Sequence, residues 1–372
     1  MNHRENVEKF LEAIVDSISI SDTMIDKAKS SYEAVGKWLG EAEIPFDIKI
    51  MPQGSFNLGT TIKPLSENED YDIDLVCLID NGSSLSDYDI KNIVGDRIKE
   101  NKLYSQKLEP EGKRCWVLGY DEFHMDILPC VPEQEIFSED DHKTDIHLTH
   151  KIAHKLYEKR VSNPIEYQQW FENRMMEVLN EAKKNFSVKA SVEIKKVPTY
   201  KVKTPLQKAV QLLKRHRDKM FEKRDDAPIS IIITTLAAQA YQGEHSLLDA
   251  LLNITANLTI GIKRGPDGSY VILNPVLEHE NFADKWGEAP QKMKNFFEWH
   301  EQLTKDITTL AEKGIFLAES DMKKSFGERP TQYAIRTIFP DDRISAVAEV
   351  SVMSPRRVNI EKPNRPFGDD LQ

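Results

Sequence analysis

The chain has 372 residues, of which 40% are apolar and 30% charged, so it can build two domains or one large bilobal unit around an ample core. Its net charge of −11 argues against a broad surface for non-specific binding to duplex nucleic acid, which depends on Lys and Arg contacts to phosphate. No apolar run approaches about 18 residues and the N-terminus lacks a signal-peptide pattern, so we expect no membrane association. Cys77, Cys115 and Cys130 form no CxxC pair and cannot all pair within one chain, which favours a reduced, cytoplasmic protein.

The first elements predicted along the chain are helices. Apolar residues recur at three-four spacing over 5–39, and Ser21 followed by Asp22 predicts the cap of a second helix inside this range. Alternating apolar and polar residues predict a strand over 46–51, just before Gly54 and Ser55. A glycine lets the backbone approach a phosphate closely, and a serine hydroxyl with backbone N–H groups can hold it.

Two acids then open a buried strand. Asp72 and Asp74 flank Ile73 and lead into the apolar run 75–79. Residues two apart on a strand point to the same face, so both carboxylates are aimed at one place. Like charges that close repel, and a hard divalent cation is the usual remedy. The alternative is an edge strand whose acidic start is simply solvated.

A third acid lies further along, in a predicted pair of strands over 116–120 and 123–128 that meet at an Asp-Glu turn. Asp126 shares one face of the second strand with His124 and Leu128, while apolar residues form the other face. A lone buried aspartate is costly unless it is paired or bound to a metal. Given the first two acids, we favour a metal-binding role for Asp126 over an exposed strand face.

The next segment, 133–155, is polar and contains four histidines. A zinc site is conceivable because His150 and His154 would be four residues apart on a helix, but no cysteine accompanies them, and we favour a solvated loop. Asn163 and Pro164 predict the start of a helix over 164–185. Residues 187–202 are interpreted as a linker between lobes.

The second half of the chain is predicted to be mostly helical. Thr204 and Pro205 open a helix, and a second helix that follows Ser230 is apolar nearly all round and therefore central. Residues 201–224 contain nine Lys or Arg against two acids, so positive charge is segregated here. We expect Lys214 to point into a cleft and Arg217 and Lys223 to lie nearer the solvent, although any of five basic residues could take the same role: Lys214, Arg215, Arg217, Lys219 and Lys223.

These features resemble the signature of the DNA polymerase β-like nucleotidyltransferase superfamily, in which Gly-Ser precedes an Asp-x-Asp strand and a third acid follows. Here 16 residues separate Ser55 from Asp72, which implies an enlarged connecting loop. Further stretches are similar to the bacterial cGAS/DncV-like nucleotidyltransferases (CD-NTases). The zinc thumb of vertebrate cGAS has no counterpart, so the case for a duplex-DNA sensor is removed. The matching stretches are 53–55, 72–75, 123–129, 162–164, 167–171, 210–218, 228–230, 274–275 and 281–286.

The resemblance implies an α+β, bilobal fold. A mixed β-sheet lobe with N-terminal helices would cover residues 1–200, and a helical lobe over 201–372 would close the active site. It further implies a template-independent enzyme that joins nucleoside triphosphates, such as ATP or GTP, into a cyclic di- or trinucleotide signal in anti-phage defence (CBASS systems), and releases pyrophosphate. A regulatory protein partner from the same defence operon is also implied.

Site residues follow from the same resemblance. Two Mg²⁺ ions, which Mn²⁺ can replace, would be held by the three acids, with Asp126 nearest the attacking sugar hydroxyl. Asn281 and Asp284 could read a base edge, although Asp284 could equally cap the helix that begins near Lys285. The catalytic and metal-binding residues are Asp72, Asp74 and Asp126. The expected nucleotide-binding residues are Gln53, Gly54, Ser55, Lys214, Ser230, Asn281 and Asp284.

Two other classes of function stay open at this point. An enzyme that adds nucleotides to an RNA end should present a more continuous basic path, because it must neutralise several backbone phosphates. A catalytically inactive nucleotide-binding scaffold is disfavoured by the three intact acids, which without a metal would only destabilise the fold.

Overall fold

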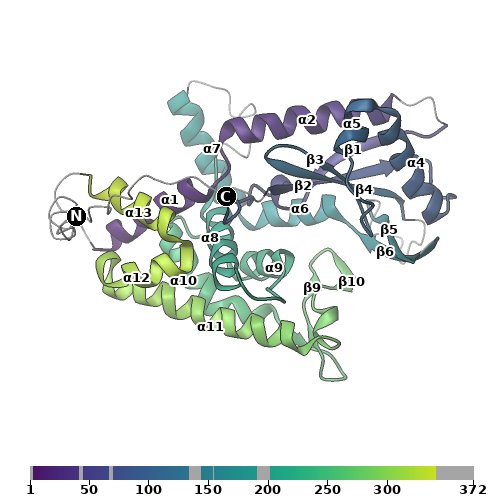
Figure 1. The fold of residues 1–372 in the computed structure, drawn as a ribbon. Helices are drawn as coiled ribbons and strands as arrows, with labels where there is room; N and C mark the ends of the chain where they lie inside the picture. Colours follow the sequence, from purple (N-terminus) through teal and green to yellow (C-terminus); the bar gives the residue numbers. More distant parts are fainter. Residues whose placement is uncertain are drawn as a thin grey trace, which may run out of the picture.

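The computed structural model describes residues 3–41, 45–66, 70–133, 144–153, 155–190 and 202–340. A mixed β-sheet with its helices forms one lobe, and a helical bundle forms the other (Figure 1). The predicted α+β, bilobal architecture is therefore confirmed. The figure also shows that the long helix α2 runs along the sheet lobe, whereas α11, α12 and α13 lie in the helical lobe.

The sheet has six strands in the order β1-β2-β4-β5-β6, with β3 also paired to β4. The central strands β2 and β4 are parallel, and the other pairings are antiparallel. One edge of β4 is shared, because β3 pairs with its first half and β5 with its last residues. The strands are β1 (Ile48–Gln53), β2 (Tyr71–Ile79), β3 (Trp116–Gly119), β4 (Phe123–Pro132), β5 (Ile146–Ala153) and β6 (Leu156–Ser162).

Helices cover one face of this sheet. Ile73 of β2 and Met125 of β4 are fully buried in a core shared with Val35 of α2 and Val94 of α4. Strand alternation sends Asp72, Asp74 and Asp126 to the opposite face. The helices of this lobe are α2 (Asp22–Gly40, capped by Ser21 as predicted), α3 (Gly54–Asn57), α4 (Asp87–Glu100) and α5 (Lys102–Lys107).

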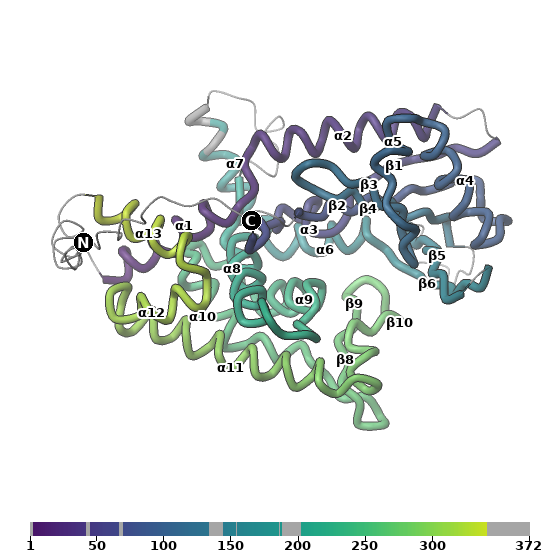
Figure 2. Tube along the Cα trace, viewed as in Figure 1, coloured from purple at the N-terminus to yellow at the C-terminus, as the bar shows by residue number. Residues whose placement is uncertain are grey.

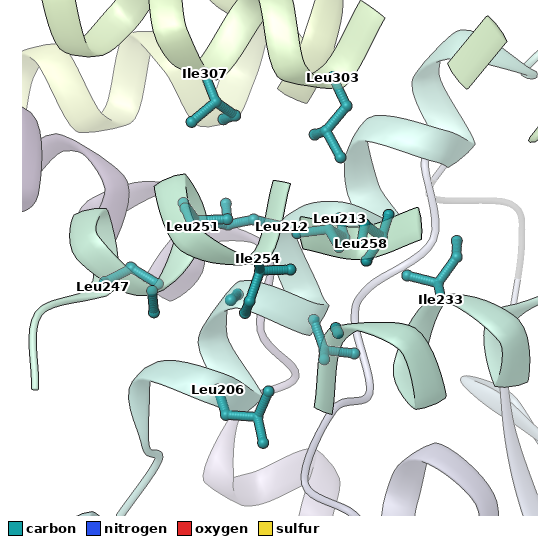
Figure 3. Packing of buried hydrophobic residues seen from close by; sticks show 14 of the residues in the cluster. Leu206, Leu212, Leu213, Ile233, Leu247, Leu251, Ile254, Leu258, Leu303 and Ile307 are labelled. Atoms are coloured by element: carbon teal, nitrogen blue, oxygen red, sulfur yellow. The ribbon is translucent and has the colours of Figure 1, made fainter. Parts of the chain in front are cut away.

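The helical lobe is built around α8 and α9. Thr204 and Gln207 form a reciprocal capping box at the start of α8, which explains why the helix begins there. Figure 3 shows leucine and isoleucine side chains of α8, α9, α10 and α11 meeting in the core. The helices are α8 (Pro205–Met220), α9 (Ser230–Ala240), α10 (Leu247–Asn257), α11 (Pro290–Lys313), α12 (Ile315–Phe326) and α13 (Glu328–Ile338). Short elements are η3 (Leu258–Gly261), β7 (Lys263–Arg264), β8 (Tyr270–Val271), β9 (Leu273–Asn274), β10 (Leu277–Asn281) and η4 (Asp284–Trp286).

The N-terminal helix α1 (His3–Ile18) packs in the helical lobe, against helices that are distant from it in the sequence (Figure 2). Phe10 and Ile14 are fully buried in the core that α8, α10 and α11 share. The Glu8 carboxylate accepts hydrogen bonds of 2.8 Å from the backbone N–H groups of Leu247 and Leu248, at the start of α10. Packing therefore joins the first helix to the C-terminal half, and the division at residue 200 remains a prediction drawn from sequence.

The predicted helix over 164–185 is two helices, α6 (Pro164–Arg174) and α7 (Met176–Ala190). The break lies at Met175, whose φ of −123° is not helical. Met175 is buried, and its sulfur accepts a hydrogen bond of 2.9 Å from Thr204 Oγ1. This tertiary contact has no local sequence signal. The expected linker over 187–202 falls partly on α7, and residues 191–201 lie outside the described ranges.

The histidine-rich segment is not the expected loop where it is described. β5 and β6 form an antiparallel hairpin, and Lys155 at its turn has a φ of 58°. His147 and His150 lie on β5, so the proposed helical spacing of His150 and His154 does not exist; His142 and His154 lie outside the described residues. His147 pairs instead with Asp87 at 2.7 Å, and His150 accepts from Arg114 at 3.0 Å.

Among the described helices, none is both long and apolar enough to cross a bilayer.

Candidate active site

Two adjacent parallel strands bring the three predicted acids together. Asp74 of β2 and Asp126 of β4 are direct register partners. Asp72 precedes Asp74 by two residues and therefore lies on the same face of β2. The apolar partners of this register, Ile73 and Met125, are fully buried on the other face. The sheet thus fixes three carboxylates at one edge of the interlobe space.

Burial is the largest cause of a raised pKa at each of the three carboxyl groups. Burial, reinforced by the charges of Asp126 and Asp72, raises the pKa of Asp74 to about 7, although Lys214 acts in the opposite direction. Burial also raises the pKa of Asp72 and that of Asp126. A cation that binds between these partly buried carboxylates would stabilise their ionised forms.

This donor set fits a divalent metal. Carboxylate oxygens are the ligands that Mg²⁺ prefers, and Asp72 and Asp74 line a cavity that has room for substrate phosphates. Across the described ranges, no three or more His, Cys, Asp or Glu side chains are placed so that they could together hold a metal ion. An ion held by these acids would therefore need substrate oxygens or water to complete its coordination.

The turn from β1 into α3 requires glycine. Gly54 has a φ of +64°, and a Cβ on it would lie 2.2 Å from the Oδ2 atom of Asp74. The next residue, Ser55, has its hydroxyl 3.1 Å from Thr61 Oγ1 and lines the cavity. Gln53 is the register partner of Asp74 on the other side of β2, and the cavity lining does not include it.

Helix α8 supplies positive charge from the helical lobe. Lys214 is 6% exposed, and its Nζ donates a hydrogen bond of 3.1 Å to the carbonyl of Thr60 in the sheet lobe. Burial, with Arg217 nearby, lowers the pKa of Lys214 to about 8, although Asp218 and the two acids of β2 act in the opposite direction. The ammonium group therefore lies between the two lobes.

A cavity of about 610 Å³ joins these elements. Its walls come from the β1–α3 turn, the segment 60–65, the start of β2, and one face of α8 and α9. Of the predicted site residues, the cavity brings together Gly54, Ser55, Asp72, Asp74, Lys214 and Ser230. Asp126 does not line it and lies beside Asp74 in the register.

Asn281 and Asp284 lie away from this cavity. The Oδ1 atom of Asn281 accepts hydrogen bonds from the backbone N–H groups of Ile272 and Ala283, at 2.9 and 3.0 Å. Asp284 is exposed, accepts from the N–H of Lys285, and lies 4.0 Å from Arg160 of β6. Asn281 thus stabilises its own turn, and Asp284 faces the outer part of the sheet.

Arg217 is a site residue that the sequence reasoning placed too near the solvent. Its side chain is only 12% exposed and lines the cavity. Its guanidinium donates to the carbonyl of Pro228 at 2.5 Å and to Ser230 Oγ at 3.2 Å. The i, i+3 spacing from Lys214 is the signal that could have found it, because such residues share a helix face.

His124 and Cys115 also contact the acids. His124 lies 3.8 Å from Asp72 and 3.2 Å from Glu109, and the Cys115 thiol donates to Asp126 Oδ2 at 3.5 Å. Burial raises the pKa of this thiol to about 12, so it stays protonated as a donor. Strand alternation already placed His124 beside Asp126, whereas the pairing of Cys115 depends on the register of β3.

Comparison with known proteins gives the family. Residues 1–174 match the Second Messenger Oligonucleotide or Dinucleotide Synthetase domain. A c-di-GMP synthase of Roseivirga ehrenbergii is 34% identical over 346 residues, which is 88% of this chain and 86% of that protein. The CD-NTase CdnG of Bradyrhizobium diazoefficiens, solved with GTP, has a TM-score of 0.72 at 19% identity over 90% of this chain and 99% of that one. CdnC of Escherichia coli MS115-1, solved in a complex with HORMA-deltaN, has a TM-score of 0.60 at 14% identity over 87% and 97%.

The chain belongs to the CD-NTase family, the cGAS/DncV-like nucleotidyltransferases. It is thus a nucleotidyltransferase of the class that produces cyclic oligonucleotides, as its sequence motifs predict.

Proposed function

We propose that the enzyme joins two nucleoside triphosphates into a cyclic dinucleotide, with GTP as a substrate. The choice of GTP and of a two-membered product rests on the 34% identical relative named c-di-GMP synthase. The observation that carries the proposed chemistry is the pairing of Asp74 with Asp126 across a cavity from Lys214.

Each bond-forming step would use the same residues. A ribose hydroxyl oxygen of the acceptor bonds to the α-phosphorus of the donor, the bond from that phosphorus to the bridging β-phosphate oxygen breaks, and pyrophosphate leaves. A second step of the same kind closes the ring. If both steps use the cavity between the acids and α8, the linear intermediate must turn around or rebind between them.

The sheet lobe would hold the donor by its phosphates. The Gly54 turn lets the backbone approach the β- and γ-phosphates, and Ser55 donates its hydroxyl to them. Lys214 and Arg217 neutralise the same phosphates from the helical lobe. Arg217 is oriented by Pro228 and Ser230, so it presents a fixed group to the substrate.

The acids would hold the divalent metal, which we propose to be two Mg²⁺ ions. When bound, such ions neutralise the triphosphate and lower the pKa of the attacking hydroxyl. Asp72 and Asp74 line the cavity where the donor would bind, whereas Asp126 lies beside Asp74 on the next strand and would be the acid nearest the acceptor hydroxyl. The Cys115 thiol would orient Asp126.

We further propose a role in anti-phage defence, in the cytoplasm where nucleoside triphosphates are available, with a regulatory protein partner. Support for a partner is the complex of the structural relative CdnC with HORMA-deltaN. Co-purification of this chain with the proteins encoded beside it would test the partner.

The enzyme's product tests the central proposal. The protein is incubated with radiolabelled NTPs and Mg²⁺, treated with phosphatase and analysed by mass spectrometry. A phosphatase-resistant cyclic dinucleotide that contains guanine is expected. Linear tails that depend on added RNA would instead identify a polymerase, and the lack of any product would identify a nucleotide-binding scaffold.

A further inference from the structure

Helix α8 presents a row of polar side chains to the segment 58–64, which contributes to one wall of the active-site cavity. At about 100° per residue, the members of this row fall within about a third of a turn of one another. On the other side of the helix, Leu206 and Leu213 are fully buried in the helical core (Figure 3). The helix is thus a fixed support for the segment. The row consists of Gln207, Gln211, Lys214 and Arg215, each of which is at most 6% exposed.

Each member of the row donates a hydrogen bond to a backbone carbonyl of the segment. Two of the donors are neutral amides and two are cations, so the charge of a bound triphosphate would attract only the cations. Because four carbonyls are held, the segment cannot move away from α8 without losing several bonds. The bonds run from Gln207 to Leu58 at 2.9 Å, from Gln211 to Thr61 at 2.6 Å, from Lys214 to Thr60 at 3.1 Å, and from Arg215 to Lys63.

The two amides differ in their other contacts. The Oε1 atom of Gln207 accepts from the backbone N–H of Thr204 at 2.9 Å, so this residue also caps α8. Gln211 takes no part in that cap. Its Oε1 atom accepts from Lys203 Nζ at 3.2 Å, and its Nε2 atom also donates to Ser19 Oγ at 3.3 Å. Gln211 is fully buried and is not among the residues that line the cavity, so a substrate there would sense it only through other residues.

Thr61 connects the amide of Gln211 to the proposed phosphate site. Its carbonyl accepts from Gln211, and its hydroxyl lies 3.1 Å from that of Ser55. A second bond joins the same two stretches, because the N–H of Thr60 donates to the carbonyl of Ser55 at 2.9 Å. Both Ser55 and Thr61 line the cavity. The bond from Gln211 therefore helps to set the position of the Ser55 hydroxyl relative to α8.

We propose that Gln211 is a positioning residue that keeps the Ser55 hydroxyl in place while Lys214 leaves the segment to bind the donor triphosphate. This inference rests on the proposed function, in which Ser55 and Lys214 hold the donor phosphates. The ammonium group of Lys214 is attracted by phosphate charge and can exchange the carbonyl of Thr60 for it. The uncharged amide of Gln211 gains no comparable attraction, so its bond to Thr61 persists. Helix α8 thus holds one segment with a cation that can leave and an amide that stays.

Calorimetry on the full chain tests the proposal without requiring turnover, with a non-hydrolysable GTP analogue and Mg²⁺ as the probe. Gln211→Met removes the donor to Thr61 at a similar side-chain length. Gln211→Glu also removes that donor but keeps an acceptor for Lys203, and it serves if Gln211→Met does not fold. We expect either variant to weaken analogue binding about tenfold, the lower end of the loss expected for Ser55→Ala. Thermal melts show which variants are folded.

The matched control is another glutamine whose amide is bonded within the helical lobe. Gln302 of α11 donates to Asp306 Oδ1 at 2.7 Å and lies outside the active-site cavity. Gln302→Met should bind the analogue as the unchanged protein does. Equal losses in the Gln302 and Gln211 variants would assign the effect to a general disturbance of the lobe and overturn the proposal.

Combination with Ser55→Ala distinguishes positioning from a purely structural role. If Gln211 acts through Ser55, Gln211→Met should weaken binding by less than about twofold in a protein that already carries Ser55→Ala. The proposal is overturned if the Gln211 variants bind as the unchanged protein does, or if their loss is as large in the Ser55→Ala protein. Failure of the unchanged protein to bind the analogue would overturn the proposed function together with this inference. Cyclic product formation is measured in parallel, so failure of the proposed function is seen separately from failure of the positioning role.

Discussion

The acidic and the basic walls of the active site are built in opposite ways. The acids sit on adjacent central strands, and their backbone pairing forces Asp74 and Asp126 together. The basic groups sit on one helix and already have partners, because Lys214 donates to the carbonyl of Thr60 and Arg217 to that of Pro228. The acids of the acidic wall therefore repel one another, and a bound cation would stabilise them. Lys214 and Arg217 of the basic wall must instead give up hydrogen bonds to the protein before they can bind phosphate. We therefore expect metal binding to reduce the repulsion among the acids, and substrate binding to change the hydrogen bonds of Lys214 and Arg217.

The largest effect should come from the acidic wall. Replacing Asp72→Asn together with Asp74→Asn should lower synthesis by about a thousandfold or more, since both groups line the cavity where we propose that the donor phosphates bind. The folded protein should be as stable without metal, or more so, because like-charge repulsion is relieved. Product assays and thermal melts measure both results. Asp96→Asn on α4, which is exposed and far from the site, is the control; retained synthesis in the double variant would remove the acids from the chemistry.

The basic wall should respond less strongly. Lys214→Ala should lower kcat/KM by roughly ten- to a thousandfold, because a fixed charge beside the triphosphate is lost. Lys223→Ala, which removes an exposed lysine, should alter little beyond the salt dependence, since such charges are screened within about 10 Å. Kinetics at two salt concentrations distinguish the two. Equal, small and salt-sensitive losses in both variants would mean that the basic residues only attract nucleotides.

Loss of the neutral hydroxyl of Ser55, which we propose to contact phosphate, should have a smaller effect on catalysis. Ser55→Ala removes one hydrogen bond to a charged group, on the order of 1.5–3 kcal/mol, so KM for NTPs should rise about ten- to a hundredfold. The midpoint of Mg²⁺ activation should move less than KM. Ser30→Ala, which removes an exposed hydroxyl that bonds the carbonyl of Asp26 in its own helix outside the cavity, is the control. An unchanged KM in Ser55→Ala would leave Ser55 with a turn-forming role alone.

The smallest expected effect is a shift of stability with pH. The pKa of Asp74 is raised in the folded state to about 7. The unfolded chain loses this proton near pH 4 while the folded protein keeps it, so metal-free stability should fall as the pH rises from about 4 to about 7 and then level off. Mg²⁺ should restore the most stability at pH 8, where the carboxylate is ionised. Thermal melts at pH 5.5 and 8, with and without Mg²⁺, measure this. Asp74→Asn should flatten the metal-free slope, and an equal slope in that variant would assign the effect to other groups.

Sequence predicted the parts of this molecule that depend on local order. Alternation around Asp72, Asp74 and Asp126 gave the correct strand faces, and Thr204 with Pro205 gave the start of α8. The register that makes Asp74 the partner of Asp126 joins residues 52 apart, so no local pattern contains it. Met175, at the break between α6 and α7, contacts Thr204, and Arg217 contacts Pro228 and Ser230, so both features involve residues outside the local sequence pattern. Long-range packing decided each feature that the sequence missed.

The place of α1 has a consequence for recombining related enzymes. The helix belongs by packing to the last third of the described chain, because Glu8 caps α10 and Phe10 fills the helical core. If two relatives exchanged their C-terminal halves at residue 200, α1 of one enzyme would have to pack against α10 of the other. A chimera that carries residues 3–18 along with 202–340 keeps both the cap and the core intact. The helical lobe is therefore discontinuous in sequence: α1 and the helices from α8 to α13 pack together, and the strands of the sheet lie between them in the chain.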